Sequence, residues 1–197
     1  DINAEVSSPS FVSINGILYV MFGSSNNKIY AADMYGNIPP GWPITLAGNL
    51  EGGIVFSDLD DDDIPEIVTL TNSGEVSVFY IDGSPYNYFP IDYGPPFTNS
   101  PIIVDIDNDS DLEIFGGSIN SLIALDIKSS GSNSGYWSMY RGNALRTGYY
   151  IYDGMLDISN ESLHPHSYEF YPVYPNPFNP VTRLEFSIPV KTEVSLT

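Results

Sequence analysis

Four short apolar runs follow one another between residues 53 and 91: Gly53-Ile-Val-Phe56, Glu66-Ile-Val-Thr-Leu70, Val78-Phe-Tyr-Ile-Asp82 and Phe89-Pro-Ile91. Each run is rich in β-branched and aromatic residues, and Gly, Pro, Asn or Asp separates it from the next. This composition is typical of β-strands joined by turns.

The same order of runs occurs before and after this segment. The earlier copy is Ser8-Pro-Ser-Phe-Val12, Ile17-Leu-Tyr-Val-Met-Phe22, Ile29-Tyr-Ala-Ala-Asp33 and Trp42-Pro-Ile44. The later copy is Ser100-Pro-Ile-Ile-Val104, Glu113-Ile-Phe115, Ile123-Ala-Leu-Asp126 and Trp137-Ser-Met139. The aromatic residues that open the fourth runs lie 47 and 48 residues apart (89 minus 42 and 137 minus 89).

Four strands at a period in the forties are typical of a β-propeller blade, whose apolar faces are buried only against neighbouring blades. The sequence therefore predicts an all-β fold with three four-stranded blades over residues 1–150. Three blades form an incomplete ring, since propellers usually have 4–8. Further blades before Asp1 or another covering surface would complete it. A β-sandwich built from the same strands is the alternative.

Two acidic loops carry the clearest chemistry, and both have acids at loop positions 1, 3, 5 and 9. They read Asp58-Leu-Asp-Asp-Asp-Asp-Ile-Pro-Glu66 and Asp105-Ile-Asp-Asn-Asp-Ser-Asp-Leu-Glu113. Ca²⁺ is a hard cation that takes 6–8 oxygen ligands, and alternate residues of a tight loop can direct their carboxylates inward. The predicted ligands of two Ca²⁺ sites are Asp58, Asp60, Asp62 and Glu66, then Asp105, Asp107, Asp109 and Glu113, with the carbonyls of Ile64 and Asp111.

These loops differ from EF-hands, because Asp63 and Ser110 replace the invariant Gly at position 6 and strands are expected on both sides. They resemble instead the calcium loops of FG-GAP repeats, the blade unit of integrin-like propellers, although Glu stands where that family usually has Asp. The first copy has the acid-free turn Ser13-Ile-Asn-Gly16 at this place, and we expect it to bind no metal. A solvated acidic turn is the alternative for both loops.

Residues 136–148 read Tyr136-Trp-Ser-Met-Tyr-Arg-Gly-Asn-Ala-Leu-Arg-Thr-Gly148. The stretch resembles the Trp-x-x-x-Arg-Gly-Asn-x-x-Arg-Thr-Gly segment of PQQ-like propellers, which would imply a quinone cofactor. Blade packing is the interpretation we favour: Trp137 and Met139 fill a core, and Arg141 and Arg146 pair with acids. No cofactor besides calcium is expected.

Near the C-terminus, Tyr174-Pro-Asn-Pro-Phe-Asn-Pro-Val-Thr182 precedes the alternating run Arg183-Leu-Glu-Phe-Ser-Ile-Pro189. The prolines favour extended backbone, and the alternation is typical of a strand. This stretch resembles the start of the C-terminal sorting domain of type IX secretion cargo, an immunoglobulin-like β-sandwich. An ordinary β-sandwich domain, similar to that of flagellar hook-cap proteins, is the alternative. We expect a linker over 151–172 and a truncated sorting domain over 173–197.

Composition restricts the function. The 25 acidic residues against 6 Lys and Arg give a net charge of −19, which repels nucleic acid and anionic membranes. Cysteine is absent, and no apolar run reaches the ~20 residues that cross a bilayer. His164 and His166 lie in a polar stretch without a third ligand nearby, and no catalytic motif is present, so no enzymatic activity is expected within these residues. A catalytic domain could lie upstream.

The prediction is a secreted or cell-surface, calcium-stabilised propeller that serves as the binding or spacer module of a larger cargo protein. The resemblance implies export by a Gram-negative bacterium and contact with its secretion machinery. The aromatic residues from Phe79 to Phe97 could bind carbohydrate or protein at the cell surface. The alternative is a self-assembling fibre or lattice subunit that pairs through exposed strands.

Overall fold

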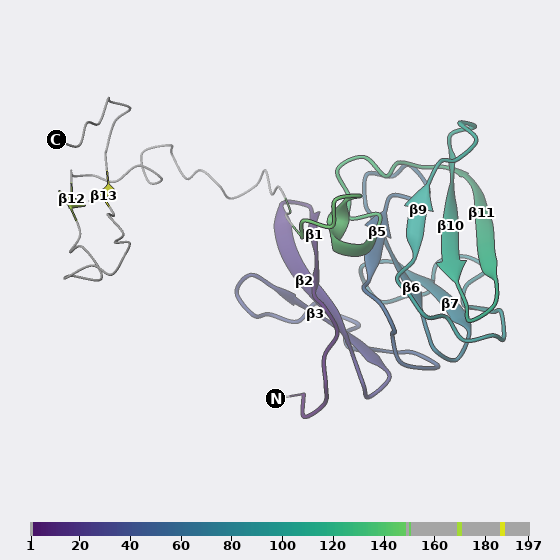
Figure 1. Cartoon of the computed structure of the whole chain (residues 1–197), viewed down its shortest axis with the longest axis horizontal. Coiled ribbons are helices and arrows are strands. Elements are labelled where there is room, and N and C mark those ends of the chain that lie inside the picture. Colours follow the sequence, from purple (N-terminus) through teal and green to yellow (C-terminus); the bar gives the residue numbers. More distant parts are fainter. Residues whose placement is uncertain (1, 149, 151–168, 171–185, 188–197) are drawn as a thin grey trace, which may run out of the picture. The chain divides into compact units, whose positions relative to one another are not determined.

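The computed structural model describes residues 2–148 and 150, together with two short strands at 169–170 and 186–187. Three antiparallel sheets account for the first part (Figure 1). Sheet 1 contains β1 (Ser10–Ile14), β2 (Ile17–Ser24), β3 (Lys28–Asp33) and β4 (Ile44–Thr45). Sheet 2 contains β5 (Val55–Ser57), β6 (Glu66–Leu70), β7 (Glu75–Phe79) and β8 (Ile91–Asp92). Sheet 3 contains β9 (Ile102–Val104), β10 (Asp111–Gly117) and β11 (Leu122–Ser130).

The all-β prediction is confirmed. The one helical element among the described residues is a single 3₁₀ turn, η1 (Tyr140–Gly142), where Arg141 has a left-handed backbone. Each sheet is a meander in which strands consecutive in the sequence are neighbours.

Strand register shows that the three sheets are built alike. Cα partners in the second and third strands are Met21 with Ala31, Val68 with Val78, and Phe115 with Ala124. In the first strands, Ser10, Val55 and Ile102 lie opposite Met21, Val68 and Phe115 respectively. Side chains at corresponding positions therefore point to corresponding faces of each sheet.

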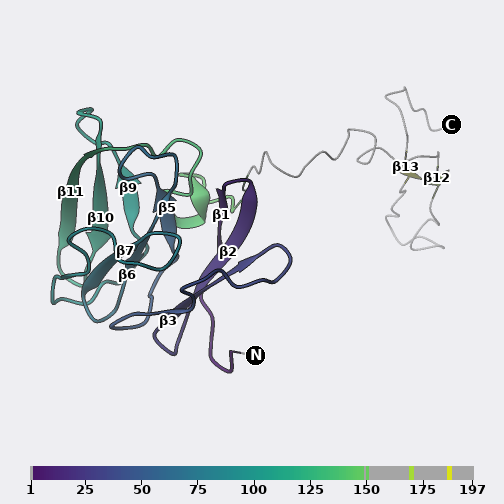
Figure 2. The same cartoon turned by 180° about the vertical axis from the view of Figure 1, so that it is seen from behind.

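Sheet 2 lies between the other two sheets. One of its faces packs through Phe56, Ile67 and Phe79 against buried side chains of sheet 1 such as Met21 and Ile29. Its opposite face packs through Val55, Val68 and Val78 against Ile103 and Ile114 of sheet 3. Both cores are apolar sheet-on-sheet contacts, so burial of these side chains is what holds the three sheets together. The reverse view in Figure 2 shows the same succession of sheets.

The prediction of a fourth strand in the third repeat is wrong. Among the described residues sheet 3 has three strands, and β11 is its edge. After β11 the chain turns back to the first strands, where the carbonyl of Trp137 accepts a hydrogen bond from Phe56 N and the carbonyl of Ser138 accepts one from Ile103 N. The reason is that the inner edges of β5 and β9 carry N–H groups that need acceptors.

The aromatic residues that open the fourth apolar runs, Trp42, Phe89 and Trp137, do not all precede a fourth strand. Trp42 and Phe89 each precede one, β4 and β8, and Trp42 donates from its indole N to the carbonyl of Ile81. Trp42 and Trp137 are buried and Phe89 is half-buried. Trp137 stacks on Phe11 of β1, so it occupies a different environment from the other two.

The chain divides into two compact units, Asp1–Tyr152 and Asp153–Thr197. In the second unit, β12 (Glu169–Phe170) pairs antiparallel with β13 (Phe186–Ser187). The remaining residues of the expected linker and sorting domain lie outside the described residues, as do His164 and His166.

Candidate metal centres

The first acidic loop, Asp58–Glu66, connects β5 to β6 and is held by its own carboxylates. Asp58 is buried and accepts hydrogen bonds from the backbone N of Asp62 at 3.1 Å and of Asp63 at 2.8 Å. Asp62 in turn accepts one from Ile64 N at 2.8 Å. These bonds turn the backbone tightly around Asp58, so alternate side chains face the same side.

Glu66 closes this loop from the first residue of β6. Its side chain is buried, and Oε2 accepts a hydrogen bond from Leu59 N at 2.7 Å. Glu66 Oε1 and Asp60 Oδ1 are buried without a hydrogen-bond partner among the described residues. Burial, together with the charges of Asp60, Asp62 and Asp58, raises the pKa of Glu66 to about 8. Burial and the charges of Asp62 and Asp58 raise the pKa of Asp60.

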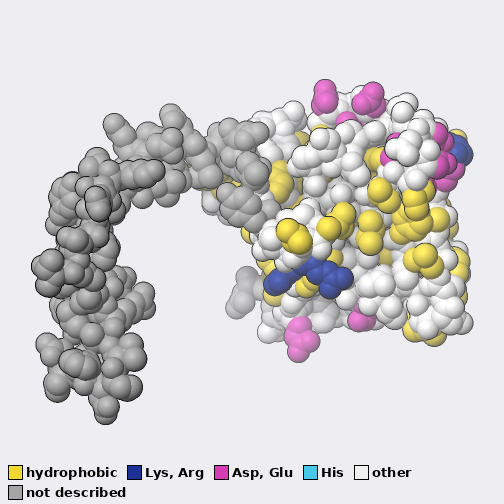
Figure 3. Space-filling model, turned by 45° about the horizontal axis from the view of Figure 1, so that its top comes forward, with side chains coloured by type: hydrophobic (Ala, Val, Ile, Leu, Met, Phe, Trp, Pro, Cys, Tyr) yellow, Lys and Arg dark blue, Asp and Glu magenta, His cyan; other side chains and the backbone are white. Residues whose placement is uncertain are grey.

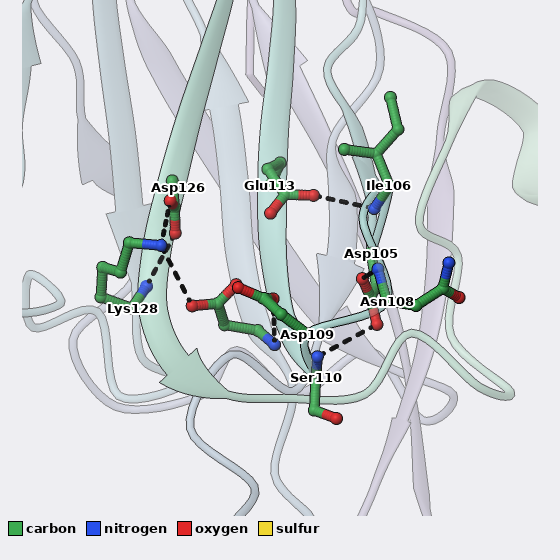
Figure 4. Close-up of polar contacts among 9 residues, drawn as sticks. Asp105, Ile106, Asn108, Asp109, Ser110, Glu113, Asp126 and Lys128 are labelled. Carbon is green, nitrogen blue, oxygen red and sulfur yellow. Dashed lines mark hydrogen bonds and ion pairs between the residues drawn. The ribbon is translucent and has the colours of Figure 1, made fainter.

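The second acidic loop, Asp105–Glu113, connects β9 to β10 with the same pattern (Figure 4). Glu113 Oε2 accepts a hydrogen bond from Ile106 N at 2.9 Å, and Asp105 accepts one from Ser110 N at 3.3 Å. Asp109 accepts one from Asp111 N at 3.2 Å. Each contact has its counterpart in the first acidic loop, so the two sequences fold into one loop geometry.

The backbone explains how these loops turn without glycine. Positions 4 and 6 are left-handed in both loops, with φ of 61° and 64° at Asp61 and Asp63, and of 62° and 78° at Asn108 and Ser110. Asn and Asp tolerate this region better than other non-glycine residues. The substitution of the EF-hand glycine at position 6 therefore leaves the turn conformation in place.

The carboxylates converge into two clusters, each of which could hold a metal ion. In the first acidic loop, oxygens of Asp58, Asp60 and Asp62 lie within 4.8 Å of one another. In the second, the cluster with the same spacing limit consists of Asp107, Asp109, Asp111 and Glu113. All donors are hard oxygens, and the first cluster adjoins two buried oxygens that lack partners, so the donor sets fit a hard divalent cation.

The clusters match the predicted ligand sets incompletely. Glu66 is outside the first cluster, although Glu113, which accepts the equivalent hydrogen bond, belongs to the second. Asp105 is outside the second, where it accepts backbone hydrogen bonds from Asn108 and Ser110. Asp111, predicted to offer only its carbonyl, contributes its carboxylate. Its identity as an acid at position 7, where the first acidic loop has Ile64, was the signal for this role.

The surroundings of the two clusters differ. Asp58 exchanges two backbone hydrogen bonds with Ser132, and Tyr136 donates from its hydroxyl to the Asp63 carbonyl, so the segment after β11 covers the first acidic loop. The second acidic loop is mostly exposed. There Lys128 lies 3.5 Å from Asp111 and also forms an ion pair with Asp126 (Figure 4).

This basic neighbour and the adjacent acids shift the second cluster's protonation. A hydrogen bond with Asp109, burial and repulsion by Asp109 and Asp126 raise the pKa of Asp111 to about 6. The same contact with Asp111 lowers the pKa of Asp109. The hydrogen bond to Asp126 is the main cause that raises the pKa of Lys128 to about 12. The two carboxylates therefore titrate together rather than independently in the metal-free loop.

A cleft of about 820 Å³ lies where the segments before β1, β5 and β9 converge with η1. Its lining includes Ser8, Glu51, Asn99, Tyr140 and Arg146. Next to it, Gly142 packs on the indole of Trp137 so closely that any side chain at this position would overlap the ring. Arg141 lies 5.8 Å above the ring of Tyr140, and among the described residues neither Arg141 nor Arg146 forms the predicted ion pair with an acid.

The aromatic residues between Phe79 and Phe97 serve mainly as packing. Phe79, Tyr86 and Phe97 are buried, with ring contacts from Tyr86 to Tyr80 at 5.3 Å and from Phe97 to Tyr93 at 5.7 Å. Tyr88 is the fully exposed member of this series. A carbohydrate-binding surface here would therefore rest on Tyr88 and the partly exposed Tyr93.

No protein-family model matches the chain, and no curated protein sequence matches it either. In the described residues no helix is long and apolar enough to span a membrane.

Proposed function

We propose that this chain is a calcium-stabilised β-propeller module of a secreted or cell-surface protein. The observation that carries the proposal is the pair of acidic clusters at the same point of two consecutive repeats, with matching hydrogen bonds from Leu59 and Ile106 to Glu66 and Glu113. The equivalent strand registers and the stacked sheets favour blades over a two-sheet sandwich, in which one sheet would not lie between two others.

Calcium suits these clusters better than magnesium. Ca²⁺ accepts 6–8 oxygens in flexible geometry at about 2.3–2.6 Å, whereas Mg²⁺ requires a near-ideal octahedron and retains several waters. Clusters that combine carboxylates with buried oxygens inside one tight loop offer many protein oxygens to the metal. The metal would neutralise the repulsion between the acids and fix the connection between β5 and β6, or β9 and β10, so its role is structural.

Within that scaffold, the module acts as a non-catalytic binding or spacer region of a larger type IX secretion cargo. The sequence from Tyr174 to Pro189 supports the secretion part of the proposal by its resemblance to sorting domains. The 820 Å³ cleft beside η1, lined by hydroxyl, amide, carboxylate and aromatic groups, is the place where a ligand such as carbohydrate would bind.

Isothermal titration of the metal-free chain with Ca²⁺ and with Mg²⁺ tests the metal assignment. We expect two Ca²⁺ per chain and weaker Mg²⁺ binding, and one Ca²⁺ in each of Asp60→Ala and Asp107→Ala. Absence of Ca²⁺ binding below millimolar concentration would overturn the proposal. Export is tested separately: deletion of residues 173–197 from the native protein should retain it in the periplasm, and export without them contradicts the sorting role.

A second candidate function is self-assembly at the cell surface. The observation that favours it is the exposure of large apolar side chains on sheet 3, including Ile102 and Leu122, which a monomeric module would leave in water.

A further inference from the structure

The outer face of sheet 3 repeats, in exposed form, a face that is buried elsewhere in the molecule. Val76 of sheet 2 and Leu122 of sheet 3 occupy equivalent positions, since they pair with Leu70 and Gly117 respectively. Val76 is 0% exposed, whereas Leu122 is 71% exposed. Val55 is 0% exposed, and Ile102 at the same register position is 44% exposed. Equivalent apolar positions therefore differ only in whether another sheet covers them.

The acidic loops show the same difference at their second positions. Leu59 is 0% exposed and packs into the core between sheets 2 and 3, whereas Ile106 is 63% exposed. With Phe115 and Ala124 at the positions of Val68 and Val78, these side chains form the outer face of sheet 3: Ile102, Ile106, Phe115, Leu122 and Ala124. Figure 3 shows hydrophobic side chains gathered on the side of the molecule where β9–β11 lie.

The opposite end of the stack has a matching surface. On sheet 1, Val20, Phe22, Tyr30 and Ala32 face away from sheet 2 and are half-buried. Phe11 is also half-buried, and Trp137 stacks on it. Phe22 and Tyr30 stack with ring centroids 5.6 Å apart. The residues equivalent to Phe11 and Val20 are Phe56 and Ile67 in sheet 2, which are buried against sheet 1. In sheet 3 they are Ile103 and Ile114, which are buried against sheet 2.

We propose that the outer face of sheet 3 binds the exposed face of sheet 1 of a second copy of this chain. The contact continues an interface that the molecule already forms twice, between sheets 1 and 2 and between sheets 2 and 3. It is head-to-tail, because the two faces belong to different sheets. Two copies joined in this way at both ends contain six sheets, a number within the range of closed propellers.

Charged side chains border the apolar part of both faces. The apolar residues of the outer face of sheet 3 are bordered on that face by Glu113 and Asp126, and Lys28 lies beside Tyr30 on the exposed face of sheet 1. Glu113 is buried and Asp126 forms an ion pair with Lys128, so the acids on this face are not left as unpaired, exposed charges.

Sedimentation and light scattering of the full chain in calcium test the contact. We expect a dimer of about 43 kDa, twice the 21.7 kDa of one chain. Leu122→Glu or Ala124→Glu should weaken self-association by about 100-fold, because each places an unpaired carboxylate in an apolar contact. Tyr35→Glu, at a highly exposed turn residue outside both faces, is the matched control and should remain dimeric.

A mixing experiment tests the head-to-tail arrangement. Tyr30→Glu alters the exposed face of sheet 1 and should also give monomers. An equimolar mixture of Leu122→Glu and Tyr30→Glu retains one intact pair of faces, so dimers should reappear in the mixture. Monomeric wild-type chain, self-association that persists in Leu122→Glu, or a mixture that stays monomeric would each overturn the proposal.

The inference deepens the second candidate function and rests on it. Its failure is distinguishable from failure of the calcium proposal, because Leu122→Glu leaves every acid of both clusters in place. A variant that binds two Ca²⁺ and melts like the wild-type monomer is folded, and its oligomeric state then reports on the contact alone.

Discussion

The two acidic loops have the same spacing of acids and the same backbone geometry, yet they lie in different surroundings. The first lies inside the stack of sheets, with Asp58 and Glu66 buried and the segment around Ser132 above it. The second lies at the open end of the stack, mostly exposed and in contact with Lys128. The loop sequence thus determines the path of the backbone, while the neighbouring elements determine the protonation of the carboxylates and what a bound metal stabilises.

The largest expected effect is on thermal stability. A site saturated at 100 times its dissociation constant stabilises the folded protein by about 2.7 kcal/mol, which is roughly 5–11 °C in melting temperature for a chain of this size. Asp60→Ala should lose at least this much, because the first acidic loop also anchors the segment at Ser132. Asp107→Ala should lose less. Calorimetric melting in calcium measures both.

Asp61→Asn is the control for this comparison, since Asp61 is outside the cluster and Asn tolerates its left-handed backbone. It should melt within about 2 °C of the wild type. In excess chelator, the difference between wild type and Asp107→Ala should disappear. A larger loss for Asp107→Ala than for Asp60→Ala would contradict the view that burial in the stack makes the first site the more important one.

The next effect is proton release on calcium binding. The pKa of Glu66 is about 8 in the folded, metal-free protein against an ordinary value of 4.5, so the folded state holds this proton more tightly than the unfolded state. Stability of the metal-free protein therefore falls as the pH rises from 4.5 to about 8. Calcium reverses this by binding the ionised cluster, and its affinity for the first acidic loop should rise over the same interval.

The calcium affinity of the second acidic loop should stop rising with pH above about 6, since the pKa of Asp111 is about 6. At pH 7, binding to the first loop should release about one proton and binding to the second about a tenth of a proton. Titration calorimetry in buffers of different ionisation enthalpy gives these numbers, with Asp107→Ala reporting the first loop and Asp60→Ala the second. Equal release from both loops would show that burial does not separate their titrations.

Comparison of the repeats also shows what could be learned from the sequence. Strands such as β2 and β6 follow from apolar runs, and the acidic loops follow from acids at alternate positions, because both depend on residues close in the chain. The path after β11 depends on distant groups, the N–H groups of Phe56 and Ile103 that bond to the carbonyls of Trp137 and Ser138, and no local sequence pattern indicates it. The ion pair between Lys128 and Asp111 likewise requires the pairing of β10 with β11.

The smallest effect concerns Lys128, which distinguishes the second acidic loop from the first. Its ammonium group lies 3.5 Å from Asp111 and pairs with Asp126, so it competes with a cation for the Asp111 carboxylate. Lys128→Asn removes the charge and retains a residue that tolerates the left-handed backbone at this position, where φ is 52°. Because an exposed ion pair contributes little, the calcium affinity of the second loop should rise by only roughly 1.5- to 5-fold at low salt.

High salt should shrink this gain, since screening weakens the exposed ion pair in the wild type. The first acidic loop, measured in the Asp107→Ala background, should bind calcium equally well with either residue at position 128 and serves as the internal control. If Lys128→Asn instead lowers the affinity of the second loop, Lys128 positions Asp111 for the metal rather than competing with it. The contrast between the two loops would then lie in how their carboxylates are oriented rather than in how they are charged.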